Sequence, residues 1–347
     1  DCKFIGNSVT SSSGSAGAIL NFAYSLGTSN ATIFNAQFIS NTAAYGGAMY
    51  NDGSTDGHAN PIISNCFFKS NNASQSSGAV YNSGYAGESN PIFRNCVFAQ
   101  NSAVYGGIAY NGGGNGGHCN AQFLNCTFWN NAASNQGGVF YNDGTSGQCT
   151  VLLMYSIAWS NTASFNPVFS NYSTTLTIGY SLVQTANCSG LGTGSTCGAG
   201  MIYNQDPQFL NTADLDGADD LYGTSVDGLT LKSCNVPLSP AVNTGIASFN
   251  SVNAPTTDIS SILRPGGTGY DMGAYERAIT LTIDNSLAAS LPAGAVIAQS
   301  TINANAPLAI SPVYLKAGAS IVLNPGFSYA STGETGRVLK AEIGGCY

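Results

Sequence analysis

A repeat with a fixed period of 30 residues constrains the fold of this chain more than any other feature. Residues 91–111, PIFRNCVFAQNSAVYGGIAYN, recur on both sides with little drift, so that phenylalanine, asparagine and glycine fall into columns. The two clearest columns are a phenylalanine and, three residues later, an asparagine: Phe38, Phe68, Phe98, Phe128, Asn41, Asn71, Asn101 and Asn131. A period of this length is the sequence signature of a solenoid.

The repeat predicts short strands rather than helices. Extended segments are expected at residues 91–93, 96–98 and 108–110, separated by turn-forming Asn, Gly and Ser. No window shows the sustained apolar spacing of a helix. Parallel coils stack about 4.8 Å apart, so like residues form ladders along the axis. We therefore predict an all-β parallel β-helix over residues 1–184.

The columns also predict which side chains lie inside. The phenylalanines fill the core, and Cys66, Cys96 and Cys126, two residues before them, share their inward face as small buried side chains. The asparagines lie at turns, where each amide can hydrogen-bond to the next one along the axis. Ligand binding is the alternative interpretation of these asparagines. The Gly-Gly step that follows indicates a sharp bend or a close backbone approach.

Composition limits the expected partners. Charged residues make up only 7% of the chain, the net charge is −8, and the hydrophobic content of 43% favours an ordered core. There is no basic patch, so nucleic acid is not an expected partner. No apolar run approaches the roughly 20 residues that span a bilayer. A surface of amides and hydroxyls suits an extracellular protein that packs against neighbours or glycans.

Four loop cysteines are candidates for disulfides. Cys188 and Cys197 close a short loop, whereas Cys119 and Cys149 lie one period apart and hence on adjacent coils. Disulfides at both places would imply an oxidising, extracellular compartment. Connectivity itself does not follow from sequence.

The solenoid shows no catalytic constellation. Asp52 and Asp143 occupy corresponding positions three coils apart, roughly 14 Å by strand spacing, which exceeds the carboxylate separation in glycosidases. His58 and His118 lie two coils apart, about 10 Å on the same spacing, and we interpret this separation as too large for one metal ion. We therefore predict no catalytic residues and no enzymatic activity.

An acidic stretch further along is the best candidate for a metal site. Its carboxylates are Asp214, Asp216, Asp219, Asp220 and Asp227. Calcium is bound by several hard oxygen ligands, and alternating aspartates around a glycine turn supply such oxygens from one loop. The spacing does not match an EF-hand, because the bidentate glutamate is missing. A calcium site and a solvated acidic loop are both open interpretations.

The repeat pattern changes twice along the chain. It decays after Asn142, and we predict irregular final rungs with the acidic loop over residues 185–276. Over residues 277–347, short apolar runs alternate with Pro and Gly, which predicts a small β-module.

These segments carry a family resemblance in three parts. The repeats, with F-x-x-N followed by Gly-Gly, resemble the polymorphic outer-membrane-protein type of right-handed parallel β-helix. Residues 155–276 resemble the tail of bacterial "choice-of-anchor Q" surface proteins through SIAWSN, YSLVQ, NQDPQF, DGLTL, LSPAVNTG and DMGAYE. Residues 291–346 resemble a three-coathanger-stack module through LPAGAVIAQSTI, VYLKAGASIVLNPGF and LKAEIGGC. The resemblance implies a right-handed helix and a secreted or surface protein from a bacterium of the Bacteroidota type.

Two functions follow as hypotheses. The first is a non-enzymatic structural or adhesive protein whose subunits stack end to end into a surface filament or sheath, because the sequence starts mid-repeat without a polar cap. The second is a secreted β-helix that binds or cleaves polysaccharides. Its aromatic residues Tyr24, Tyr45, Tyr85 and Tyr105 could stack on sugars, although Tyr45 and Tyr105 could instead shield a bend. Expected partners are other copies of the chain, glycans or a cell surface.

Overall fold

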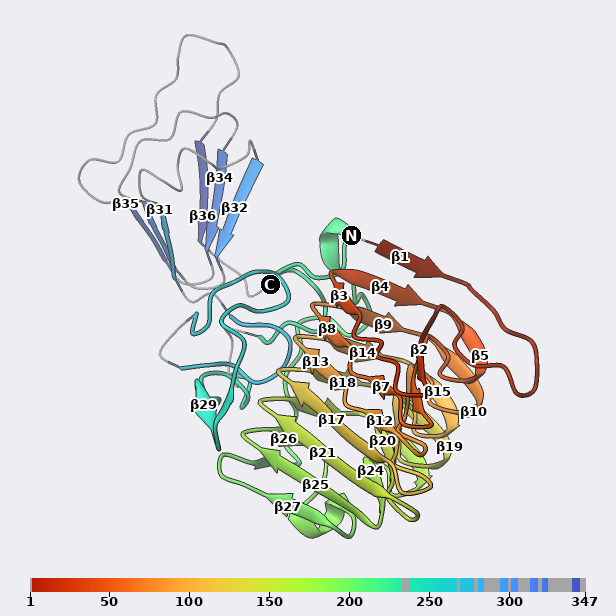
Figure 1. Ribbon diagram of the computed structural model, residues 1–347. Helices are drawn as coiled ribbons and strands as arrows, with labels where there is room; N and C mark the ends of the chain where they lie inside the picture. The colour runs from red at the N-terminus through yellow and green to blue at the C-terminus, as the bar shows by residue number, and fades with distance from the viewer. Residues whose placement is uncertain are drawn as a thin grey trace.

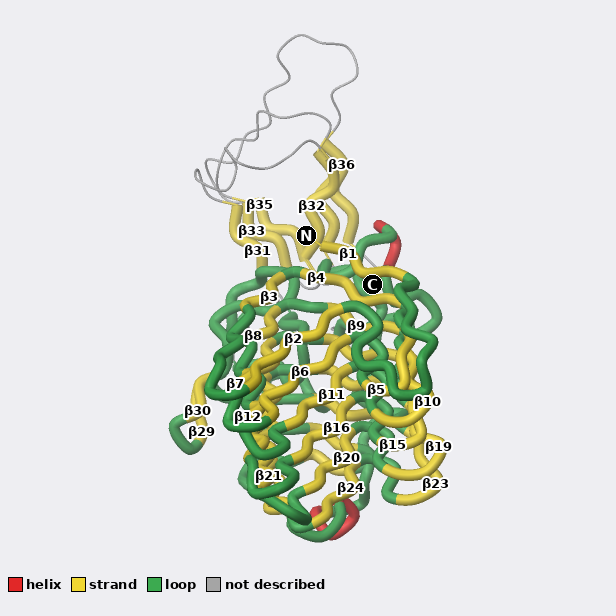
Figure 2. The backbone as a smooth tube through the Cα atoms, turned by 45° about the vertical axis from the view of Figure 1, so that its right-hand side comes forward, coloured by secondary structure: helices red, strands yellow, loops and turns green. Residues whose placement is uncertain are grey.

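The computed structural model describes residues 2–232, 238–266 and 269–277, and six strands between residues 280 and 343. Its main body is a parallel β-solenoid in which successive coils of the chain, called rungs below, stack in register (Figures 1 and 2). Four sheets run along the solenoid, and neighbouring strands within each sheet are parallel. The predicted all-β solenoid is confirmed.

Two of the sheets hold eight and five strands. The first sheet contains β1 (Cys2–Ile5), β4 (Ala36–Ile39), β9 (Phe67–Lys69), β14 (Val97–Ala99), β18 (Thr127–Trp129), β22 (Ile157–Trp159), β26 (Leu182–Val183) and β28 (Ile202–Tyr203). The second sheet contains β5 (Thr42–Tyr45), β10 (Asn72–Ser76), β15 (Ser102–Tyr105), β19 (Ala132–Gln136) and β23 (Thr162–Phe165). This second sheet corrects the prediction of three strands per repeat, because its short segments of small and polar residues carry no strong strand pattern.

The other two sheets hold six and nine strands. The third contains β2 (Ile19–Tyr24), β6 (Met49–Ser54), β11 (Val80–Ser83), β16 (Ala109–Gly112), β20 (Phe140–Asp143) and β24 (Phe169–Tyr172). The fourth contains β3 (Thr32–Phe34), β7 (His58–Ala59), β8 (Ile62–Ser64), β12 (Glu88–Ser89), β13 (Ile92–Arg94), β17 (His118–Leu124), β21 (Gln148–Met154), β25 (Thr174–Gly179) and β27 (Ser195–Cys197).

Inward-facing phenylalanines of the first sheet form a continuous stack. They pair in register, and consecutive ring centroids lie 4.6, 4.7 and 5.4 Å apart. The members of this stack are Phe38, Phe68, Phe98 and Phe128. Cys66, Cys96 and Cys126 are fully buried free thiols in the same core. Both columns lie inside, as predicted, and aromatic stacking adds to the stabilisation from burial.

Buried asparagines form ladders of hydrogen bonds along the solenoid axis. The Nδ2 and the backbone N of Asn71 both donate to Oδ1 of Asn101, at 2.9 and 3.0 Å, and Nδ2 of Asn101 also donates to the carbonyl oxygen of Phe68 at 2.9 Å. The same bonds join Asn41, Asn71, Asn101, Asn131 and Asn161. Along the third sheet, side-chain amide bonds join Asn51, Asn82, Asn111, Asn142 and Asn171. The predicted amide ladders are confirmed.

The small-residue step is a close approach of neighbouring backbones. Gly46 has a φ of +63°, which an L side chain rarely adopts. A Cβ atom at Gly47 would lie 2.2 Å from the carbonyl oxygen of Gly78 on the next rung. Glycine is therefore required at the second position, whereas the first also accepts Ser77, which has a φ of 68°; the close approach that the repeat predicted is confirmed.

After β28 the chain leaves the solenoid instead of forming further rungs. The described residues of 204–277, called the return segment below, pack on the outer face of the first sheet. The segment contains the short 3-10 helix η2 (Gly217–Asp219) and the hairpin of β29 (Ser248–Phe249) and β30 (Val252–Asn253). Another short 3-10 helix, η1 (Cys188–Leu191), belongs to the last rung. The predicted irregular rungs over residues 185–276 therefore end at Tyr203.

The return segment packs there because the outer face of the first sheet is apolar over several rungs. A second hydrophobic core forms between that face and the segment, separate from the core inside the solenoid. Its buried members include Val97, Ile157, Leu182, Leu229, Met272 and Tyr275. Removal of these side chains from water favours this packing, since the hydrophobic effect scales with the apolar area buried.

The six described strands beyond residue 279 pair into two parallel three-stranded sheets, in agreement with the predicted β-module. One sheet contains β31 (Thr280–Ile283), β33 (Thr301–Ala304) and β35 (Ser320–Leu323), and the other contains β32 (Gly294–Ala298), β34 (Val313–Ala317) and β36 (Leu339–Ile343). Within the described part of the chain, no helix has the length and apolar character needed to cross a membrane.

The amide ladder yields a test of what holds the rungs together. Replacement Asn101→Ala removes the acceptor of the Asn71 backbone N and side-chain amide, and the amide that donates to the Phe68 carbonyl oxygen and to Asn131 Oδ1. We expect the free energy of unfolding to fall by about 2–4 kcal/mol, because buried unpaired polar groups are costly. The matched control is Asn72→Ala, whose exposed amide bonds only to Ser102 Oγ, with an expected change below about 0.5 kcal/mol. Equal urea midpoints for both variants would contradict a stabilising ladder.

Candidate functional site

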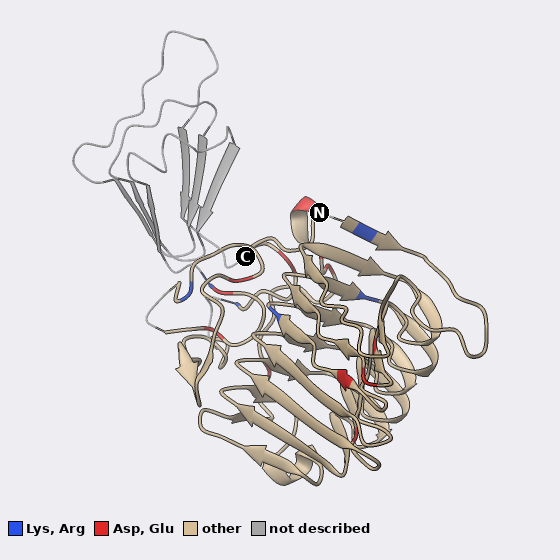
Figure 3. Cartoon of the chain, viewed as in Figure 1, with Lys and Arg blue, Asp and Glu red and all other residues tan. Residues whose placement is uncertain are grey.

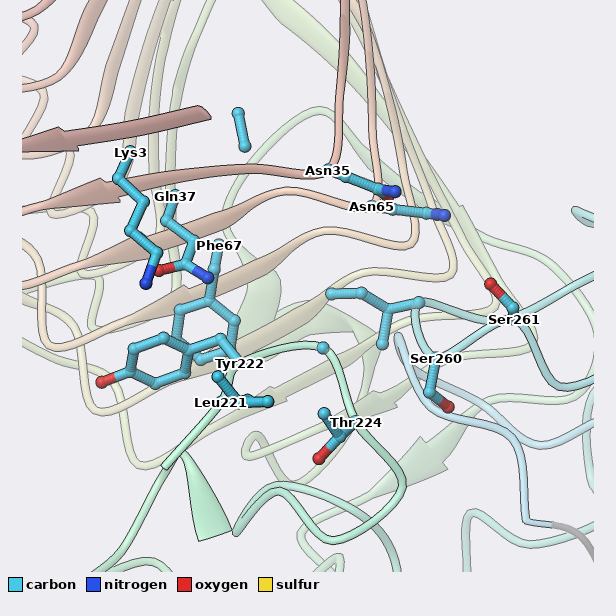
Figure 4. Close-up of a pocket in the computed structure, with 13 residues that line it drawn as sticks. Lys3, Asn35, Gln37, Asn65, Phe67, Leu221, Tyr222, Thr224, Ser260 and Ser261 are labelled. Carbon is cyan, nitrogen blue, oxygen red and sulfur yellow. The ribbon is translucent and has the colours of Figure 1, made fainter. Parts of the chain in front are cut away.

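A polar hollow lies where the return segment meets the first rungs. This polar groove has a volume of about 410 Å³ and runs between strands β1, β4 and β9 on one side and residues 221–224 and 259–261 on the other. In Figure 4 the side chains of Lys3 and Gln37 extend from the strands toward Tyr222. Eight of its lining residues carry polar side chains: Lys3, Asn35, Gln37, Asn65, Tyr222, Thr224, Ser260 and Ser261.

The groove opens where the outward column of the first sheet changes from apolar to polar. In register along that column stand Lys3, Gln37, Phe67, Val97, Thr127 and Ile157. From Phe67 onward the column is buried beneath the return segment. Lys3 is exposed and Gln37 is half-buried, so at these two rungs the segment no longer packs against the sheet and a hollow remains.

A column of turn asparagines changes its role in the same way. The Nδ2 of Asn95 donates to the Thr257 carbonyl oxygen at 2.8 Å, which ties the return segment to the solenoid. Two and one rungs earlier, Asn35 and Asn65 occupy the equivalent turn, with φ values of 52° and 53°, and line the groove instead. Asn35 and Asn65 thus face a cavity here, and Asn65 Oδ1 also accepts a hydrogen bond from Asn95 Nδ2 at 3.1 Å.

Tyr222 anchors the wall that faces the strands. Its ring stacks on Phe67 with centroids 4.2 Å apart, and its hydroxyl lies 2.6 Å from Lys69 Nζ, which donates to it. Burial raises the pKa of the Tyr222 hydroxyl. The ring and the hydroxyl of Tyr222 are therefore both held by the solenoid.

The last aspartate of the acidic stretch supports this wall from behind. The Asp227 carboxylate is buried and accepts hydrogen bonds from Gly223 N at 2.7 Å, Thr224 Oγ1 at 2.9 Å and the Tyr275 hydroxyl at 2.5 Å. Burial raises the pKa of Asp227 to about 6. Both carboxylate oxygens of Asp227 therefore already accept hydrogen bonds from the protein.

The other predicted calcium ligands lie on the surface of the same loop. Asp219 and Asp220 are exposed, and Asp214 and Asp216 are half-buried beside η2. Within the described ranges, no three His, Cys, Asp or Glu side chains are gathered as a metal site. The structure therefore does not bring the five aspartates together, and calcium stays a prediction.

One of the two candidate disulfides is formed. Cys188 and Cys197 are bonded, with Cα atoms 6.0 Å apart. Cys119 and Cys149 are free, buried thiols that face the same direction on adjacent strands of the fourth sheet. The predicted Cys119–Cys149 disulfide is therefore wrong. Side chains in register project side by side, whereas a disulfide needs Cβ atoms that approach each other.

The exposed tyrosines divide into two kinds. Tyr24 and Tyr85 are 57% and 55% exposed and free to contact a ligand. Tyr45 and Tyr105 pack edge-on against outward tyrosines of the third sheet, with centroids 5.7 and 5.3 Å from those of Tyr81 and Tyr141. The interpretation that Tyr45 and Tyr105 shield a bend is therefore the better one.

A histidine–glutamate–histidine column was missed by the sequence analysis. Glu88 pairs in register with both His58 and His118, so the three stand on consecutive rungs, and they line a second hollow of about 410 Å³, called the corner groove below. The Nδ1 atom of His58 lies 3.0 Å from Glu88 Oε2. The signal was present, because Glu88 lies one period from each histidine.

The return segment closes on a buried network of charges. Arg264 Nη1 donates to Glu276 Oε2 at 2.8 Å, with both side chains fully buried. Glu276 also accepts from the backbone N atoms of Gly266 and Asp271, and Asp258 accepts from the backbone N of Glu276 at 2.8 Å. These bonds hold the motif DMGAYE (residues 271–276), called the clasp below, against the rest of the return segment. The motif therefore has a structural role.

Comparisons with protein-family models, with curated proteins and with solved structures find no match for this chain. The three-part resemblance inferred from the sequence therefore stays a prediction.

Because Glu276 is buried in the clasp, we predict that the free energy of unfolding falls as the pH rises. Burial, and then repulsion from Asp271, raise the pKa of Glu276 to about 7 from 4.5. A carboxyl whose pKa is higher in the folded state holds its proton more tightly there, so its stabilising contribution is present below pH 4.5 and is lost as pH rises through 7. We expect the free energy of unfolding to fall by about 1–3 kcal/mol between pH 5 and pH 8.

Urea denaturation across this pH range measures the effect. The variant Glu276→Gln should flatten the profile, while the control Asp219→Asn, on an exposed side chain, should retain it. A wild-type stability that is constant or rises from pH 5 to pH 8 would show that Glu276 stays ionised in the fold.

Proposed function

We propose that this protein is a non-enzymatic, extracellular adhesive protein that binds glycans in the polar groove. The observation that carries the proposal is the lining of the groove: three amides and two serine hydroxyls converge on one cavity of about 410 Å³. Amides and hydroxyls both donate and accept hydrogen bonds, which matches the dense hydroxyl groups of a sugar. A volume of this size suits a small number of sugar rings.

The same lining supports binding rather than cleavage. Hydrolysis of a glycosidic bond ordinarily needs two carboxylates flanking it. The groove's described lining residues include no Asp or Glu, and Lys3 is their one charged side chain. A ligand held there meets groups that orient it but none that can serve as the acid and base of a glycosidase.

Two features of the whole chain support a place outside the cell. The Cys188–Cys197 disulfide is typical of oxidising compartments. The solenoid carries few charged residues, as the few blue and red segments of its backbone in Figure 3 show. Such a surface can approach other neutral polymers with little desolvation of ions.

Glycan-array screening followed by calorimetry tests the proposal. The variant Gln37→Leu removes an amide from the groove without touching the inward core, and we expect at least a tenfold loss of affinity for the best array ligand, since an unpaired polar contact costs about 1–3 kcal/mol. Gln122→Leu, on an equivalent outward position of β17, is the matched control. No array binding, equal losses in both variants, or release of reducing ends from the ligand would each overturn it.

End-to-end association is a second candidate, favoured by the apolar first rung. Large apolar side chains there are more than half exposed: Ile5 57%, Leu20 54%, Phe22 51% and Phe34 58%. They belong to β1, β2 and β3, each of which is the last described strand at one end of its sheet. Stacking of one solenoid on another would place a further rung beside these residues and continue the ladders into a filament.

Electron microscopy of native material, together with sedimentation, tests this second candidate. Filaments with a subunit repeat along the solenoid axis are expected, and Phe22→Lys in the same full-length protein should shorten them by placing charge in the contact. Monodisperse monomers at every protein concentration would exclude it.

A further inference from the structure

The corner groove gathers an unusual share of the solenoid's titratable groups. It lies along the glycine-rich loops between the third and fourth sheets and is lined by Asp56, His58, Glu88 and His118. The chain contains two histidines in all, so both of them line this groove. Residues 1–184 hold eight acidic or basic side chains, and two of these, Asp56 and Glu88, are here as well. None of these four residues lines the polar groove, so the proposed glycan site does not account for them.

Strand register places the two histidines on either side of one carboxylate. Glu88 on β12 pairs with His58 on β7 and with His118 on β17. Adjacent parallel strands are about 4.8 Å apart, so each histidine backbone lies about one strand spacing from that of Glu88. The side chains of His58 and Glu88 are 39% and 38% exposed, so an ion from solvent can reach them.

We infer that His58, Glu88 and His118 bind one divalent transition-metal ion of the zinc class. Imidazole nitrogens and a carboxylate oxygen are ligands that Zn²⁺ takes in proteins, with bonds of about 2.0–2.2 Å. Two ligand atoms on one tetrahedral ion lie roughly 3.3 Å apart at such bond lengths. His58 Nδ1 and Glu88 Oε2 are 3.0 Å apart, so an ion can replace the proton they share with little movement of either side chain.

His118 completes the site from the opposite side of Glu88. The structure does not gather three such side chains around a point in its described residues, so the His118 ring must turn toward the carboxylate when the ion binds. His118 is half-buried at the rim of the groove, and surface rotamers interconvert on the picosecond-to-nanosecond scale. The backbones of the two histidines lie about two strand spacings apart, and the His58 imidazole already contacts the carboxylate between them.

Zinc titration of tag-free protein tests the inference, because the chain's own histidines are its only two imidazoles. The probe is zinc chloride, read by calorimetry and by the NMR signals of the two rings. Saturable binding of one ion per chain is expected, with both imidazole signals shifting together. His58→Asn, His118→Asn and Glu88→Gln should each weaken binding at least about tenfold.

Two control variants separate this site from other ion-binding groups. Gln148→Ala changes the next residue of the same column, and Asp214→Asn changes the acidic loop; neither should alter zinc affinity. Circular dichroism and urea midpoints verify that every variant folds. Unmoved imidazole signals at millimolar zinc, or undiminished affinity in either histidine variant, would overturn the inference, and loss of affinity in Asp214→Asn alone would assign the ion to the acidic loop.

Discussion

The in-register stacking of identical buried amides is the constraint on which the rest of this structure depends. A parallel solenoid places each residue beside its counterpart one rung away, so a buried polar side chain has another of its kind within hydrogen-bonding reach. Asparagine meets this condition because its amide both donates and accepts, as Asn71 and Asn101 show. A serine or aspartate column could not repeat the same pair of bonds from rung to rung, and any shift of register would leave buried groups unpaired.

The ladders fix the inward face and leave the outward face free to vary, and this variation decides where the return segment lies. Its apolar residues pack where the outward column reads Phe67, Val97 and Ile157, and its clasp binds where Thr127 Oγ1 accepts from the Ala274 backbone at 2.9 Å. Packing stops where the column turns to Gln37 and Lys3. The polar groove is therefore a consequence of two side chains in one column.

The solenoid could be predicted from the sequence, whereas the return segment could not. Column positions such as Phe98 and Asn101 follow from a period that is visible in the chain itself. The contact of Tyr222 with Phe67, by contrast, joins positions far apart in the sequence without any repeated spacing. The spacing of the aspartates marks the acidic loop, but a local pattern could not show that Asp227 would turn inward and accept hydrogen bonds from Gly223 and Thr224. The column of the corner groove could have been predicted, because the 30-residue period alone aligns Glu88 with His58 and His118.

Departures from the repeat are thus the places where chemistry can arise in a fold of this kind. An inward substitution interrupts a ladder and destabilises several rungs, while an outward one changes only the surface at that rung. Stacking then multiplies its effect, because three outward substitutions in one column bring side chains from three separate loops within one or two strand spacings. His58, Glu88 and His118 arise in this way. A solenoid can therefore gain a site without any change to its core, and the column in which neighbouring rungs differ most is the one to inspect first.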